Sequence, residues 1–313
     1  MKKPFKFLSL LTTGCLAAAL LVGCNSGSQN EAGNSASPPE TTATEQAPVE
    51  VPKKVVALNS TNVEIIHALG KTSSLVGIDR SAHMLGFDYL DKIKDVGHPY
   101  QPNVEGIIAL KPDLVLATEE NLEDKTAEQL RTGGVKVTIL EESYKDGIDG
   151  LKRRITEVAK IFNEPAKGEE LIAKVDADVA ALKAKVEKAK SKPKIFFLYA
   201  HGPGDAFITG TDSGADVLIK LAGGENAASF TSGRKPLTAE AMVQASPDAI
   251  IMLGRGMKAV KGIDGALKLP GVMQTPAGKN RKIIQVDNSI RWVGPRFPEF
   301  ASKLFDELHK PAQ

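Results

Sequence analysis

Short apolar runs alternate with amphipathic segments from residue 54 onward. Three of the apolar runs predict buried strands, at positions 54–58, 113–117 and 135–140. The segments between them predict two helices: residues 62–69, capped by Asn59 or Ser60 and ended by Gly70, and the charged residues 119–131. This alternation is typical of a parallel sheet covered by helices.

A long helical pattern separates this part of the chain from a second alternating part. Residues 147–190 are interrupted only at positions 163–165, and the later part carries one apolar stripe, formed by Leu171, Val175, Val179, Leu182 and Val186. A strand pattern then restarts at residues 194–199. We therefore predict an α/β protein with two Rossmann-like lobes, residues 53–165 and 191–313, joined by a single long α-helix over residues 166–190.

An internal repeat supports two lobes. Residues 105–117 align with residues 240–252 at an offset of 135, and a Glu and a Pro-Asp pair match in the two copies. Each copy predicts a short helix that begins near the Glu, a Pro-Asp turn and a buried strand. The alignment places Glu105 and Glu240 at equivalent positions of the two lobes.

The first 52 residues have a different composition. Three lysines precede an apolar stretch that ends near Val22, which predicts a secretory signal. Residues 24–52 hold Ser, Asn, Thr, Glu, Gln and Pro with few large apolar side chains, so we expect a disordered tether. Leu21, Val22 and Gly23, immediately before Cys24, resemble a bacterial lipobox.

The lipobox resemblance implies a location. It implies a signal peptide over residues 1–23 and a lipid on Cys24, which would hold the body at the extracytoplasmic face of the cell membrane. We expect the lipid to be the sole membrane contact, because no other stretch approaches 18 apolar residues.

Charge and cysteine content exclude several classes of function. The formal net charge is +2, and removing the three lysines of the leader leaves −1. A nearly neutral body does not favour nucleic-acid binding, which needs a basic face. Both cysteines, Cys15 and Cys24, precede the body, so a zinc finger or a cysteine nucleophile there is excluded. The chain carries no nucleophile elbow, phosphate-binding loop or dinucleotide motif, so we expect no enzyme activity and no cofactor of its own.

The lipobox, the lobe–helix–lobe plan and the repeated Glu resemble the substrate-binding lipoproteins of ABC importers for iron–siderophores, haem and cobalamin. The most specific stretches are residues 96–105 (Val96-Gly-His-Pro-Tyr-Gln-Pro-Asn-Val-Glu105), 218–226 and 235–240. Residues 269–278 and Gly294-Pro-Arg296 resemble the haemin-binding branch in particular.

This resemblance implies a function. The ligand would lie in a cleft between the lobes, and Glu105 and Glu240 would meet arginines of the permease. The transported ligand would be haem, and a ferric siderophore or cobalamin are the alternatives from the same family. We expect the carrier to be a monomer.

The resemblance also implies candidate ligands for the haem iron. By motif position, the axial ligand of one haem-binding relative falls on His98 and that of another on Tyr100, so both stay open. Tyr100 is favoured because a phenolate oxygen suits ferric iron. His201 follows the strand 194–199, where open α/β sheets bind ligands, so Tyr100 with His201, one donor from each lobe, is the expected axial pair.

Cations and apolar groups are expected around such a ligand. Arginines would pair with the propionates, and the only Trp would stack on the macrocycle or pack beside it. The candidates for this pocket are Arg80, Met84, Arg255, Arg291, Trp292 and Arg296, with Arg234 as a further cation. His67 and His309 lie in helical patterns and are assigned to packing, and His83 lies beside Met84 in a loop.

Overall fold

The computed structural model describes residues 50–202 and 204–310. The signal peptide, Cys24 and most of the expected tether therefore lie outside the described residues. Within the described part, no helix combines the length and the apolar character needed to span a bilayer.

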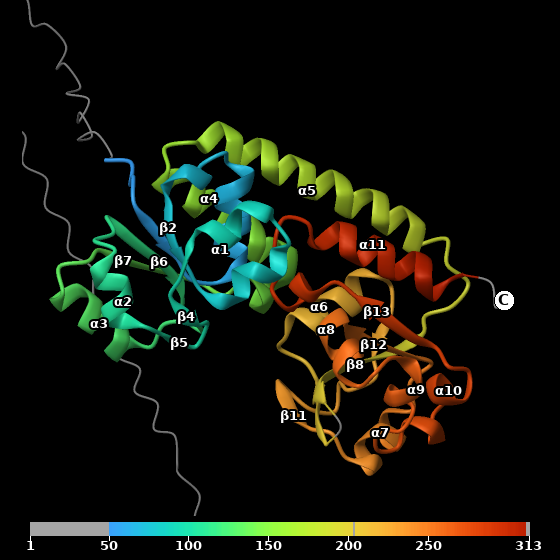
Figure 1. The fold of residues 1–313 in the computed structure, drawn as a ribbon. Coiled ribbons are helices and arrows are strands. Elements are labelled where there is room, and N and C mark those ends of the chain that lie inside the picture. The colour runs from blue at the N-terminus through green and yellow to red at the C-terminus, as the bar shows by residue number, and fades with distance from the viewer. Residues whose placement is uncertain (1–49, 203, 311–313) are drawn as a thin grey trace, which may run out of the picture. The chain divides into compact units, whose positions relative to one another are not determined.

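The first sheet is parallel throughout. Its strand order is β3-β2-β1-β6-β7, and in Figure 1 it lies in the blue to green part of the ribbon. The strands are β1 (Val55–Ala57), β2 (Leu75–Ile78), β3 (Lys94–Asp95), β6 (Leu114–Thr118) and β7 (Val137–Leu140). The three predicted strands are β1, β6 and β7, so they are confirmed.

Helices and a small hairpin complete the first lobe. The α-helices are α1 (Ser60–Ala68), α2 (Val104–Ala109), α3 (Asp124–Thr132) and α4 (Gly147–Ile161). The short 3-10 helices are η1 (Thr72–Ser74), η2 (Arg80–Leu85), η3 (Asp88–Lys92) and η4 (Ser143–Asp146), and the hairpin pairs β4 (Gly97–His98) with β5 (Gln101–Pro102). The side chain of Asn59 accepts a hydrogen bond from the Thr61 N–H, which makes Asn59 the cap of α1.

The second sheet is mixed. Its order is β11-β9-β8-β12-β13, with β10 beside β8. The strands are β8 (Lys194–Gly202), β9 (Asp205–Thr209), β10 (Glu225–Asn226), β11 (Arg234–Pro236), β12 (Ala249–Leu253) and β13 (Ile283–Val286). Strand β9 is antiparallel to both neighbours, unlike the expected parallel alternation. The connection from Gly202 to Asp205 is too short for the crossover that a parallel pair needs, so these strands form a hairpin.

The helices of the second lobe are mostly short. They are α6 (Gly214–Leu221), α7 (Ala239–Ala245), α8 (Gly254–Ala259), α9 (Ile263–Ala266), α10 (Pro276–Lys279) and α11 (Phe297–Leu308), with the 3-10 helices η5 (Val272–Gln274) and η6 (Asn288–Arg291).

Helix α5 (Pro165–Val186) joins the lobes and runs beside α11 (Figure 1). It begins at the predicted interruption, where Asn163 has a φ of 53° and Pro165 occupies the first turn. The buried side of α5 includes Val175 and Leu182. The helix ends before the predicted residue 190, because the apolar stripe ends at Val186 and the lysine-rich residues that follow have no apolar face to bury.

The repeat is present in three dimensions. The side chains of Asn103 and Thr238 cap α2 and α7, each by accepting a hydrogen bond from the N–H three residues on. After the helices, Lys111 and Ser246 both have left-handed backbone, with φ values of 47° and 41°. All four residues obey the 135-residue offset, so one local structure is built twice.

Candidate functional site

A cavity lies between the carboxyl ends of strands from the two sheets. It encloses about 620 Å³ of empty space, part of which is open to solvent. The first lobe contributes three lining residues, Tyr100, Glu120 and Tyr144. The second part of the chain contributes Phe197, Tyr199, Thr209, Asp212, Ser213, Gly214, Ala215, Gly233, Arg234, Arg291 and Trp292. Ligands of open α/β sheets bind at this kind of edge.

Tyr100 connects the two sides of the cavity. Its phenol oxygen accepts a hydrogen bond of 2.8 Å from Nη2 of Arg291, and it donates a longer one, 3.4 Å, to Oε1 of Glu120. Burial raises the pKa of Tyr100, while the Arg291 guanidinium acts in the opposite direction. Burial also raises the pKa of Glu120, helped by the nearby Glu142. In the ligand-free protein Tyr100 is therefore a neutral phenol.

Buried polar residues fix the loop that carries Tyr100. The amide of Asn121 donates a hydrogen bond of 2.9 Å to the carbonyl of Pro99. The other side-chain atom of Asn121, Oδ1, accepts from Asn59 and from Thr118, both at 2.7 Å. Because these side chains are buried and lie at or just after the ends of β1 and β6, they hold the residue before Tyr100 in place.

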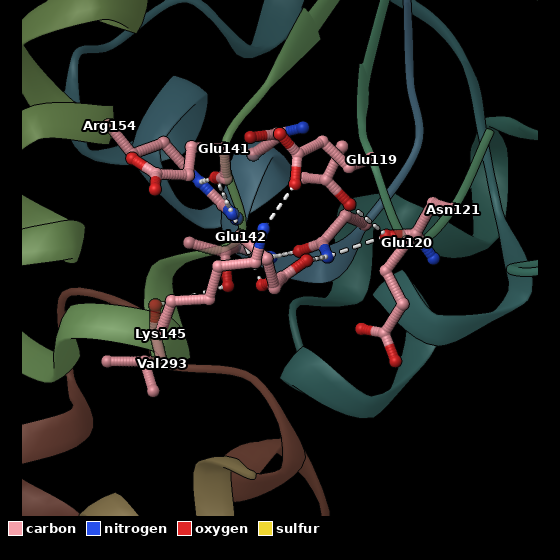
Figure 2. Close-up of polar contacts among 12 residues, drawn as sticks. Glu119, Glu120, Asn121, Glu141, Glu142, Lys145, Arg154 and Val293 are labelled. Carbon is pink, nitrogen blue, oxygen red and sulfur yellow. Dashed lines mark hydrogen bonds and ion pairs between the residues drawn. The ribbon is translucent and has the colours of Figure 1, made fainter. Parts of the chain in front are cut away.

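An ion pair extends this network (Figure 2). Arg154 and Glu142 are buried and lie 3.2 Å apart, and Glu142 also accepts from the amide of Asn59. Arg154 donates further to the carbonyl of Glu141. Burial lowers the pKa of Arg154, and Glu142 opposes that effect. Breaking a buried pair of this kind costs about 3–5 kcal/mol, so the network is a rigid support for the Tyr100 side of the cavity.

Three arginines surround the ring of Tyr199 on the other side of the cavity. The guanidinium carbons of Arg255, Arg234 and Arg291 lie 5.1, 5.6 and 5.6 Å from its centroid. Arg255 also donates a hydrogen bond to the Tyr199 hydroxyl, and Arg234 lies 4.4 Å from the Phe207 ring. Burial lowers the pKa of Arg255, and the positive charge of Arg291 acts in the same direction.

These three arginines differ from the other six of the chain. Among the described residues, Arg234, Arg255 and Arg291 form no ion pair with a carboxylate, although Glu120 and Asp212 line the cavity together with Arg234 and Arg291. Each of the other six has a carboxylate partner, in the pairs Arg80–Asp95, Arg131–Glu128, Arg153–Asp146, Arg154–Glu142, Arg281–Asp264 and Arg296–Glu64. The cavity thus concentrates cations that have no carboxylate partner.

The two histidine candidates lie at the edge of the site. His98 is exposed, its Nδ1 accepts a hydrogen bond from the Tyr100 N–H at 3.3 Å, and it is not among the lining residues. His201 is exposed at the end of β8, and its ring lies edge-on to Tyr199 with the centroids 4.7 Å apart. Of the three axial candidates, only Tyr100 lines the cavity.

The pocket candidates divide into two groups. Arg291 and the buried Trp292 line the cavity, and Arg255 contacts its wall through Tyr199. The expectation for Arg80, Met84 and Arg296 needs correction, because none of them lines it.

Arg80 and Arg296, which do not line the cavity, each have a carboxylate partner outside it. The exposed Arg80 pairs with Asp95, and Arg296 pairs with the buried Glu64. Met84 is half-buried in η2.

Sequence reasoning missed Glu120, Tyr144 and Tyr199 as cavity residues. Tyr199 lies near the carboxyl end of a predicted strand, and Glu120 lies shortly after another. Open α/β sheets bind ligands at these strand ends, so the argument that made His201 a candidate applies to both residues. Glu105 and Glu240, in contrast, are exposed in the first turns of α2 and α7 and do not line the cavity.

Metal-ligating side chains are not grouped in the described part of the chain. No cluster of three or more His, Cys, Asp or Glu residues with the geometry to hold a metal ion occurs there.

Comparison with known proteins agrees with this architecture. The apo form of the periplasmic heme-binding protein RhuT from Roseiflexus sp. RS-1 superposes with a TM-score of 0.78 at 33% identity, over 83% of this chain and 99% of RhuT. The uncharacterized ABC transporter substrate-binding lipoprotein YvrC of Bacillus subtilis is 27% identical over 94% of each chain. The ferric-anguibactin-binding protein FatB of Vibrio anguillarum is 30% identical over 75% of each. A family model described as periplasmic binding protein matches residues 55–290, and the chain therefore belongs to that family.

Proposed function

We propose that this protein binds ferric haem outside the cytoplasmic membrane and delivers it to the permease of an ABC importer. The observation that carries the proposal is the group of three arginines around Tyr199, which has no carboxylate partner among the described residues. It is supported by the similarity to RhuT, a heme-binding protein. The carrier would perform no chemistry on its ligand and would hold haem as cargo.

The arginine group favours an anionic ligand. Guanidinium groups brought together and partly removed from water repel one another, and a bound carboxylate relieves that repulsion. The two propionates of haem match this requirement. Cobalamin, whose corrin side chains end in neutral amides and which carries a single phosphodiester, would offer these guanidiniums fewer anionic groups than haem does.

The iron would be held by Tyr100 from the first lobe. Its oxygen lines the cavity, and Arg291 at 2.8 Å would stabilise the phenolate formed on ligation. His201, beside Tyr199, is our candidate for the second axial position, and His98 is the alternative to Tyr100 in the first lobe.

A ferric siderophore is the second candidate ligand. It would use the arginine group in the same way, and FatB is a relative with such a ligand. A hexadentate siderophore differs from haem in leaving Tyr100 without a bond to iron, because it already fills the coordination sphere.

Absorption titration separates these ligands. Adding hemin should produce a sharp Soret shift with phenolate charge-transfer bands, and Tyr100→Phe should remove those bands. His201→Ala should change the spin state, and His98→Ala is the matched test of the alternative. Unchanged spectra in all three variants would overturn the axial assignment. Absence of hemin binding together with quenching of Trp292 by a ferric siderophore would replace haem with the siderophore.

Delivery requires a membrane location and a docking surface. We propose that Cys24 is lipidated and that Glu105 and Glu240, exposed at equivalent points of the repeat, pair with arginines of the permease. Mass spectrometry of the membrane-extracted protein should find a diacylated N-terminal Cys24. An unmodified N-terminus at another residue would contradict the anchor.

A further inference from the structure

One short segment links the cavity to a buried carboxylate of the first lobe. This segment, the strap (residues 291–296), begins with the cavity residues Arg291 and Trp292 and ends at Arg296. It follows the second sheet in sequence, yet three of its residues bond to the first lobe. Arg291 donates to Tyr100, the Val293 carbonyl accepts from the Thr61 hydroxyl at 3.3 Å, and Arg296 binds Glu64.

Glu64 receives the end of the strap through two hydrogen bonds to one oxygen. Oε1 accepts from the backbone N–H of Arg296 at 2.9 Å and from its Nε at 3.0 Å. The same guanidinium donates to the Leu85 carbonyl at 3.2 Å and lies 4.8 Å from the Phe87 ring. Glu64 is only 5% exposed and Arg296 is half-buried, so an ion pair with a buried carboxylate joins α1 to the strap.

The strap fits closely around this carboxylate. A Cβ added to Gly294 would lie 2.5 Å from Oε2 of Glu64, closer than non-bonded atoms can approach. Trp292 and Val293 are buried as well. A close-packed interior transmits displacement instead of absorbing it, so movement at Arg296 would reach Arg291 a few residues away.

We propose that Glu64 is a positioning residue for the ligand cavity: by holding Arg296 it fixes the strap and thereby places Arg291 and Trp292 against the ligand. The identity of the ligand rests on the proposed function above, but the positioning itself does not. Glu64 does not line the cavity, so its effect on binding is transmitted through the strap.

The only tryptophan of the chain reports on the strap without any ligand. In Glu64→Gln the charge is lost, and Trp292 should become several-fold more accessible to acrylamide while circular dichroism shows a folded protein. Hemin affinity should fall about 10- to 100-fold, as when the residues that orient a metal ligand are removed. Glu164→Gln is the matched control, because Glu164 pairs with Lys71 and Lys167 away from the strap, and it should change neither quantity.

A second variant tests the same contact by shape alone. Gly294→Ala should displace Glu64 and raise the quenching of Trp292, and adding Glu64→Asp, which shortens the acid by one methylene, should restore both quenching and affinity. Gly294→Ala also keeps the test available if Glu64→Gln does not fold. Unchanged Trp292 quenching in folded Glu64→Gln or in Gly294→Ala would overturn the positioning role. Failure of the unsubstituted protein to bind hemin would instead count against the proposed function, with the quenching result unaffected.

Discussion

Nη2 of Arg291 donates a 2.8 Å hydrogen bond to the phenol oxygen of Tyr100, and the two residues are 191 positions apart in the chain. The bond joins the two walls of the cavity at the atom that we expect to bind iron. It also places a permanent positive charge beside a phenol whose pKa burial raises. The pH dependence and the strength of ligand binding should depend on this arrangement, and docking to the permease should depend on the internal repeat.

Haem affinity should rise with pH. Because the pKa of Tyr100 lies above its ordinary value, the free protein holds the phenol proton, and ligation to ferric iron must release it. Below that pKa the affinity should increase about tenfold per pH unit. Hemin titrations across about pH 6 to 9 check this expectation.

The control for the pH dependence is Tyr100→Phe, in which the slope should vanish. If a neutral imidazole ligates the iron instead, binding releases no phenol proton, and the affinity should not rise tenfold per pH unit across the upper part of this range. A flat profile in the unsubstituted protein would therefore point to His98 or His201.

The arginines around Tyr199 should bind the ligand's carboxylates. Arg255→Gln removes a partly buried charge beside Tyr199 and should weaken hemin binding by about 2 kcal/mol, or about thirtyfold in Kd. Arg281→Gln is the control, because Arg281 pairs with Asp264 at the surface, and its effect should be negligible. Hemin dimethyl ester, which lacks free carboxylates, should bind Arg255→Gln and the unsubstituted protein with similar affinity.

Glu105 and Glu240 should affect transport and not ligand binding. Both carboxylates are exposed and neither lines the cavity, and charges at the rim of an interface govern encounter and register. Replacing both with Ala should leave hemin affinity unchanged, while the uptake of hemin into membrane vesicles that contain the permease should fall. A parallel loss of ligand binding would refute the docking role.

Asp113 and Asp248 should both stabilise the fold, and unequally. The Asp113 carboxylate accepts from the N–H groups of Lys53 and Lys54, both at 2.8 Å, whereas the Asp248 carboxylate accepts one hydrogen bond within the described part of the chain, from the N–H of Lys194. Both aspartates are exposed, so each Asp→Ala change should lower the free energy of unfolding by about 0.5–1.5 kcal/mol, with the larger loss at Asp113. Urea denaturation measures both. Asp205→Ala, at an exposed strand end, should stay within about 0.5 kcal/mol.

The lobes should move little on binding. Helix α5 is a continuous connection of 22 residues, and the Glu64–Arg296 and Arg291–Tyr100 contacts add links between the lobes. Small-angle scattering should therefore find nearly equal radii of gyration with and without hemin, unlike proteins in which hinged domains close. A marked compaction would contradict this expectation.

Local signals in the sequence predicted the elements and the duplication. Capping by Asn59, the interruption before Pro165 and the turn at Lys111 before Pro112 depend on neighbours within a few residues. Such signals act wherever the segment lies in the fold, and each was confirmed. The antiparallel strand β9 was not predicted, because its strand pattern is short. Its pairing with β8 and β11 forms only in the folded sheet.

The site could be predicted only in part. Tyr100 and Arg291 came from motif and position, and the structure brings them together. Arg296 lies five residues after Arg291 and was grouped with it, yet its partner is Glu64, 232 positions away. Sequence proximity thus indicated the right segment and the wrong environment for one of its two arginines.

The sequence by itself determined which segments form the main strands and helices, that one unit occurs twice, and which residue types are available to a ligand. Only the tertiary structure decided which arginines lack a carboxylate partner in the protein and can pair with that ligand. The reason is that a guanidinium pairs with carboxylates that are near it in space, and these can be distant in sequence. Arg255 and Arg296 have the same side chain; the second has Glu64 within 3.0 Å, and the first has the ring of Tyr199.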